Sequence, residues 1–204
     1  MTDPRTVFAS AAHAFAALVR QIPDDRWDEA GLGEWTVRDL VGHTSRSLIT
    51  VSTYLRTPAE REDTGSPAAY YVWVHDFSAS VDASSIVERG RRAGQDLGAD
   101  PAGAVDSLVA RTLTDLDGVG DPLIEVIGGQ GIRLSSYLPT RTFELAVHSL
   151  DIARAVGIGD IPPADVLTEA AALAAQIGVA LGHGPALLLA MTGRADLPGG
   201  FSVV

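Results

Sequence analysis

Glu144 and His148 are the two residues of this chain whose types and spacing are best suited to chemistry. They lie four residues apart within residues 140–151. Four residues make about one turn of an α-helix, so both side chains project from the same face. A carboxylate and an imidazole placed in this way can bind one metal ion from one side. At least a third ligand must then come from another part of the chain.

His43 is the best candidate for that third ligand. It lies at the edge of the apolar stripe of an expected helix. The chain contains no Cys, so His, Asp and Glu must hold any metal. Two His and one carboxylate suit a catalytic zinc site, and also iron, nickel or manganese. Two other interpretations stay open, because Glu144 and His148 could be a solvated pair and His43 a hydrogen-bonded core residue.

A narrow polar strip runs along the helix that carries the pair. On a helical wheel it spans about 80° and consists of Arg141, Glu144, His148 and Asp151. Apolar residues flank it on both sides, namely Phe143, Val147, Leu150, Leu145, Ile152 and Val156. A surface helix normally has one apolar stripe and a broad polar face, so this pattern favours a polar site inside a bundle. Asp151 could orient an imidazole, pair with Arg154 or face solvent.

Composition excludes several classes of function. The net charge of −11 and the pI of about 4.7 argue against binding to nucleic acid or to anionic membranes. No stretch of about 18 apolar residues is present and the first residues do not resemble a signal peptide, so a cytoplasmic location is expected. All basic residues are Arg, which is typical of a GC-rich genome such as that of an actinobacterium. Neither a phosphate-binding loop nor a Gly-x-Ser-x-Gly motif occurs.

The pattern of apolar residues predicts a mostly helical chain. Helices are expected over 5–22, 36–55, 68–98, 102–116, from Pro139 to Val156, over 164–181 and over 185–192. The β-prone residues 69–77 make the start of the third helix uncertain. Residues 24–34 and 56–67 are expected to be loops, and residues 123–126 and 132–134 a small hairpin. Four long helices indicate a bundle in a single domain over residues 1–204.

Three segments of the chain resemble the mycothiol-dependent maleylpyruvate isomerase family, which belongs to the DinB-like metalloenzymes. They are residues 35–43, 137–157 and 187–194. The second is the most specific, since Pro139, Arg141, Glu144, His148 and Asp151 occur in register. The resemblance implies a DinB-like four-helix bundle that holds a divalent metal, usually zinc.

The metal ligands implied by the resemblance are His43, Glu144 and His148. An external thiol, typically mycothiol, is the implied cosubstrate, together with a small electrophile. Family isomerases often carry a second, C-terminal domain, which is not expected in a chain that ends at Val204. We therefore expect a metal-dependent thiol S-transferase or a thiol-assisted isomerase, in which Arg141 and Arg46 could hold a substrate carboxylate. A homodimer is plausible only as the commonest oligomer.

Two alternatives remain open. The same three ligands could activate a water molecule, which would give a hydrolase of small amides or esters. The protein could also be a non-catalytic metal-binding protein induced by stress. A requirement for added thiol during turnover separates the first alternative from the expected activity.

Overall fold

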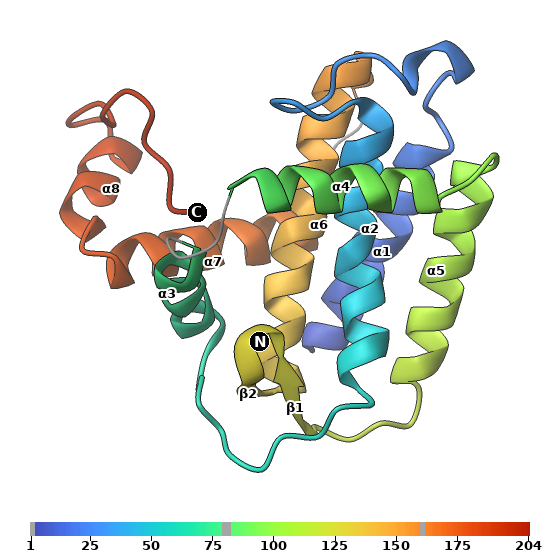
Figure 1. The fold of residues 1–204 in the computed structure, drawn as a ribbon. Coiled ribbons are helices and arrows are strands. Elements are labelled where there is room, and N and C mark those ends of the chain that lie inside the picture. The colour runs from blue at the N-terminus through green and yellow to red at the C-terminus, as the bar shows by residue number, and fades with distance from the viewer. Residues whose placement is uncertain (1–2, 79–82, 160–161) are drawn as a thin grey trace.

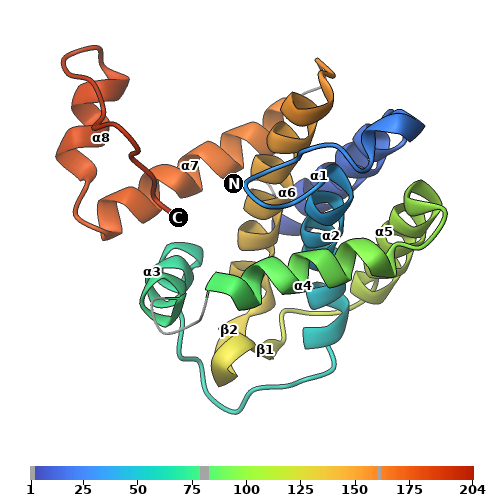
Figure 2. The same cartoon turned by 45° about the horizontal axis from the view of Figure 1, so that its top comes forward.

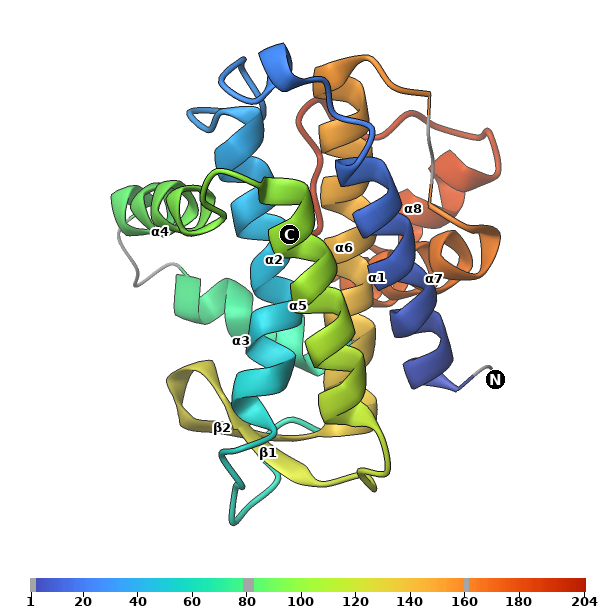
Figure 3. The same ribbon diagram turned by 90° about the vertical axis from the view of Figure 1, so that its right-hand side faces the viewer.

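The computed structural model describes residues 3–78, 83–159 and 162–204. Its central unit is a four-helix bundle in which the helices run side by side (Figures 1 and 3). These helices are α1 (Pro4–Val19), α2 (Val37–Tyr54), α5 (Pro101–Leu116) and α6 (Leu134–Val156). The predicted all-α class is confirmed. Among the described residues, no helix is both long and apolar enough to cross a membrane.

Local signals explain where the first bundle helices begin. The Asp3 side chain accepts a hydrogen bond from the Arg5 backbone N–H, and Pro4 occupies the first helical position of α1. A capping box begins α2 where the sequence predicted a helix to start: the Thr36 hydroxyl and the Asp39 carboxylate each accept from the other residue's backbone N–H. This cap fixes the register of α2, and with it the direction of His43.

Helix α6 begins five residues earlier than the sequence indicated. The prediction placed its start at Pro139, but the first residue is Leu134 and Pro139 lies inside the helix. A distant cap accounts for the difference, because the Asp121 carboxylate accepts hydrogen bonds from the Ser135 backbone N–H and hydroxyl, both at 2.8 Å. The predicted end is confirmed, with Gly157 in the left-handed region at φ 74°.

The expected helix over 68–98 is wrong as a single element. It is two helices, α3 (Pro67–Ser78) and α4 (Ala83–Asp96), and residues 79–82 lie outside the described part of the chain. The β-prone residues at its start are helical because tertiary packing overrides propensity: Tyr70 and Tyr71 are buried against the core.

Helix α4 lies across α2 on the outside of the bundle (Figures 1 and 2). The two helices touch through their backbones. A Cβ atom added to Gly42 would lie 2.2 Å from the backbone nitrogen of Gly94. One added to Gly90 would lie 2.5 Å from the Trp35 indole. Glycine therefore permits a close crossing beside His43.

The remaining elements surround the bundle. The predicted hairpin is confirmed as β1 (Leu123–Val126) paired antiparallel with β2 (Gln130–Arg133), joined by the 3-10 turn η2 (Ile127–Gly129). A second 3-10 turn, η1, covers Asp24–Arg26. Helix α7 (Ala164–Ala180) packs on α6, α1 and α3, and α8 (Gly184–Met191) lies against α7 at the edge of the molecule (Figure 2).

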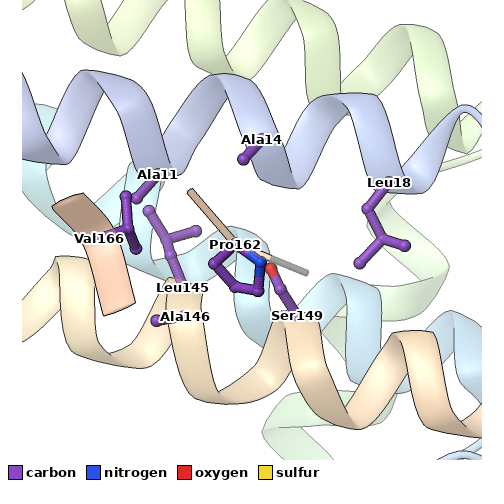
Figure 4. Close-up of a pocket in the computed structure, with 8 residues that line it drawn as sticks. All are labelled: Ala11, Ala14, Leu18, Leu145, Ala146, Ser149, Pro162 and Val166. Atoms are coloured by element: carbon purple, nitrogen blue, oxygen red, sulfur yellow. The ribbon is translucent and has the colours of Figure 1, made fainter. Parts of the chain in front are cut away.

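The inner faces of the bundle helices form the core. The largest fully buried side chains there include Phe8, Phe15, Leu40, Leu48, Leu145 and Ile152. A small void remains between α1, α6 and the start of α7, lined mainly by apolar side chains such as Leu18, Leu145 and Val166 (Figure 4). Its volume of about 10 Å³ has room for roughly one water molecule, so it is a packing gap and not a binding site.

Candidate metal centre

Helix α6 presents its polar strip to a partly enclosed space. The side chains of Glu144, His148 and Asp151 are 25%, 15% and 26% exposed. The flanks differ from each other, because Leu145 and Ile152 are fully buried whereas Leu150 is 41% exposed. The strip thus lies where the bundle interior meets a cavity.

The structure brings the side chains of Glu144, His148 and His43 together. Glu144 Oε2 lies 3.4 Å from His148 Nε2, as the spacing of one helical turn requires. His43 reaches the pair from α2, and its ring centroid lies 5.1 Å from that of His148 at an interplanar angle of 82°. One possible ligand atom from each residue lies within 4.8 Å of the others. Three such atoms can surround a single cation and leave other coordination positions open.

Two further side chains hold these residues in place. Asp151 Oδ2 lies 3.2 Å from His148 Nδ1. Of the three roles considered for Asp151, the structure therefore shows the contact with an imidazole. The Tyr71 hydroxyl donates a 2.6 Å hydrogen bond to Glu144 Oε1 and lies 3.2 Å from the Thr140 carbonyl oxygen. Such partners fix the orientation of metal ligands and the ring tautomer of histidine.

The surroundings of His43 provide a test of whether a metal fits. The indole ring of Trp35 lies on its imidazole, with centroids 4.4 Å apart, and donates its own N–H to the Val87 carbonyl. His43 Nδ1 is buried and has no hydrogen-bond partner within the described residues. A buried polar atom without a partner is costly in a folded protein. A buried imidazole with an unpaired nitrogen, in a cluster with a carboxylate and a second imidazole, fits a divalent cation.

Burial and neighbouring charges move the three pKa values in different directions. Burial, together with the charge on His148, lowers the pKa of His43 to about 4. Burial also acts to lower the pKa of His148, but hydrogen bonds to Asp151 and Glu144 outweigh it and raise the pKa to about 9. For Glu144, burial favours the neutral acid, yet the hydrogen bond with His148 and the charge of Arg141 bring its pKa to about 2. Opposite shifts in one cluster are typical of functional sites.

His43 and Glu144 line a cavity of about 210 Å³ between α2, α3, α4 and α6, which we name the metal cavity. The Arg141 guanidinium projects into it, 5.0 Å from the ring centroid of Tyr137 and 5.8 Å from that of Tyr70. Its Nε donates to Thr140 Oγ1. Arg46, the other predicted substrate-binding residue, lies in the wall formed by α2. The cavity can therefore hold a small molecule, with guanidinium groups available for a carboxylate.

The other histidines lie apart from this cluster. His13, His75 and His183 are exposed, on α1, on α3 and before α8. Over residues 3–78, 83–159 and 162–204, the group of His43, Glu144 and His148 is the one set of His, Asp and Glu close enough to hold a metal ion.

Replacement of Tyr71 by Phe should weaken metal binding by about 10- to 100-fold, because it removes the hydrogen bond that orients Glu144. Competition with a chromogenic chelator measures the affinity. Tyr70→Phe is the matched control, since Tyr70 contributes its ring to the Arg141 contact and no hydroxyl contact to Glu144. Equal affinities in the two variants would contradict this role of Tyr71.

Comparison with known proteins supplies one match. Residues 8–153, well over half of the chain, match the family model described as the mycothiol maleylpyruvate isomerase N-terminal domain. This range contains all three candidate ligands and the whole of residues 35–43, but not residues 187–194. No curated protein and no solved structure matches the chain. The chain therefore belongs to the family of mycothiol maleylpyruvate isomerase N-terminal domains.

Proposed function

We propose that the protein is a metal-dependent thiol S-transferase or a thiol-assisted isomerase. It would use an external thiol, mycothiol, to react with a small electrophilic substrate. The observation that carries the proposal is the cluster of His43, Glu144 and His148 at a cavity large enough for a small molecule. Family membership supports the choice of thiol. The absence of Cys from the sequence agrees with it, because a thiol nucleophile must then come from outside.

His43, Glu144 and His148 would hold the divalent ion, and zinc is the metal we propose. A divalent ion in such a site supplies two effects: it lowers the pKa of a bound thiol and polarises a substrate oxygen. The chain's own residues supply orientation. Asp151 accepts from His148 Nδ1 and leaves Nε2 directed at Glu144, while Tyr71 holds the other oxygen of that carboxylate.

Arg141 would position the electrophile. The rings of Tyr70 and Tyr137 fix its guanidinium at the cavity wall, and its one side-chain hydrogen bond to the described residues, to Thr140, uses only Nε. The two terminal nitrogens of the guanidinium therefore remain available for a bidentate contact with a carboxylate. Arg46 faces the same cavity and would add a second positive charge.

The test is a panel of small electrophiles assayed with and without mycothiol, and with and without a chelator. We expect turnover only when both thiol and metal are present. Turnover with metal but without thiol would instead indicate a hydrolase and contradict the proposal. Full metal occupancy without turnover of any electrophile would indicate a non-catalytic metal-binding protein.

A cytoplasmic location and zinc as the native ion also stay predictions.

Metal binding should release about one proton per ion at pH 7.5. At that pH the metal-free site holds an ionised Glu144 and a neutral His43, whose pKa values are about 2 and about 4, and a protonated His148, whose pKa is about 9. The ion must displace the His148 proton, so apparent affinity should rise about tenfold per pH unit from about pH 4 to about pH 9 and then level off. Calorimetry in buffers of different ionisation enthalpy counts the protons, and a count of zero would contradict the assignment of His148.

A further inference from the structure

A second cavity, which we name the arginine groove, lies between α2, α4 and α5. Its volume is about 530 Å³. The groove shares Arg46 and Arg89 with the wall of the metal cavity, but His43, Glu144 and Arg141 do not line it. Four arginine side chains line it, namely Arg46, Arg89, Arg92 and Arg111.

The four arginines form no ion pair with any carboxylate of the described residues. The side-chain hydrogen bond found among them runs from Arg89 Nε to the Ser85 carbonyl, 3.1 Å away. Other arginines of the chain do pair with acids, for example Arg20 with Asp106 and Arg91 with Glu34. One acidic residue, Asp96, also lines the groove, and it makes no ion pair with the four.

This clustering is unusual for the composition of the chain. Acidic residues outnumber basic ones by 26 to 15 in the chain, whereas four arginines and one aspartate line this groove. Guanidinium groups gathered around one groove repel each other and favour a local positive potential on an acidic protein. A bound anion would relieve this repulsion. Guanidinium groups match the geometry of phosphate and carboxylate oxygens.

The groove is also held by rigid elements. Gly42 lies in its wall, and the backbone contact of Gly42 with Gly94 fixes α4 against α2. The wall hydroxyls of Ser45 and Ser107 donate to carbonyls of their own helices. The guanidinium groups are therefore the donors that remain for a ligand in the groove.

We propose that the arginine groove is a binding site for a small molecule that carries an oxyanion, either a phosphoryl group or a carboxylate. Arg92 and Arg111 hold the anion from α4 and α5, and Arg46 and Arg89 complete the site from the side of the metal cavity. The site is distinct from the metal centre, because none of the candidate metal ligands lines it and only Arg46 and Arg89 are shared with the metal cavity.

The test uses two weakly chelating probes, inorganic phosphate and succinate, titrated into the metal-loaded protein at low ionic strength with sodium chloride as the reference. Calorimetry or ligand-observed NMR measures binding. We expect saturable binding of at least one probe that weakens with added salt. The double variant Arg92→Gln/Arg111→Gln should weaken it by about tenfold or more, because two charge-assisted contacts are lost. The tighter probe identifies the phosphoryl or carboxylate class.

Two controls make the result decisive. Arg154→Gln removes an exposed helical arginine outside the groove and should bind as the unmodified protein does. Arg141→Gln removes the guanidinium of the metal cavity, so it should abolish any probe binding at the proposed electrophile site and keep the binding in the arginine groove. No saturable binding of either probe would overturn the proposal. Equal binding by the double variant would overturn it too, as would the loss of all saturable binding in Arg141→Gln, which would place the anion in the metal cavity alone.

Discussion

Replacement of His43, Glu144 or His148 by Ala should in each case remove the bound metal, which we expect at about one equivalent per chain. The three ligand atoms lie within 4.8 Å of one another, so each residue supplies a ligand that no neighbour replaces. Loss of a ligand from a three-residue site removes most of the affinity. Metal analysis after gel filtration measures the stoichiometry, and circular dichroism follows the helical content.

Glu144→Ala has a second effect, because it leaves the Arg141 charge and the Tyr71 hydroxyl without their acidic partner. Glu144→Gln separates folding from binding, since the amide oxygen still accepts from Tyr71 while the negative charge is gone. It should lose the metal and keep the fold. His13→Ala removes an exposed histidine of α1 and should retain full occupancy. Full occupancy in any ligand variant would remove that residue from the site.

Replacement of Gly42 by Ala should lower the free energy of unfolding by about 2 kcal/mol. A helical Gly→Ala change normally stabilises by about 1 kcal/mol. Here the new methyl group would lie 2.2 Å from the Gly94 nitrogen and 2.4 Å from the Ala93 carbonyl carbon, which are backbone atoms of α4. Helix α4 must then move away from α2. Urea denaturation followed by circular dichroism measures the change.

Gly65→Ala is the control, because a Cβ atom there meets nothing within 4 Å. Its stability should change by about 1 kcal/mol at most. A gain in stability for Gly42→Ala, as at an ordinary helical site, would contradict the close crossing of α2 and α4.

Most of the fold could be predicted from local sequence signals. The expected start of α2 near residue 36 and the expected end of α6 at Val156 were correct, and both boundaries depend on local residues, the capping box at Thr36 and the left-handed Gly157. The errors arose where distant residues decide. Asp121 caps α6 across 14 residues of sequence, so nothing near Pro139 indicates the earlier start. The sequence pattern also did not separate α3 from α4, because apolar residues recur at helical spacing in both elements.

For the candidate site, the sequence predicted the relative positions of the two residues that lie one turn apart on α6. Periodicity placed Glu144 and His148 on one face and left His43 as a candidate third ligand, and the resemblance to a family implied that the three residues act together. Tyr71 was missed, because its hydrogen bond to Glu144 depends on how α3 packs against α6. Trp35 was missed as a neighbour of His43 for a similar reason: its position depends on the crossing of α4. The one sequence signal for Tyr71 was its place beside a second tyrosine in an expected helix. Such a pair is equally typical of residues in a hydrophobic core.

The most direct test of the central claim is the absorption spectrum of the cobalt-substituted protein as mycothiol is added. If His43, Glu144 and His148 hold the ion with open positions toward the cavity, the thiol should coordinate as its thiolate. A new thiolate-to-cobalt charge-transfer band should then appear in the near ultraviolet. It should be absent with S-methylated mycothiol and in Glu144→Gln. A protein that binds one cobalt ion but shows no new band with mycothiol would contradict the account.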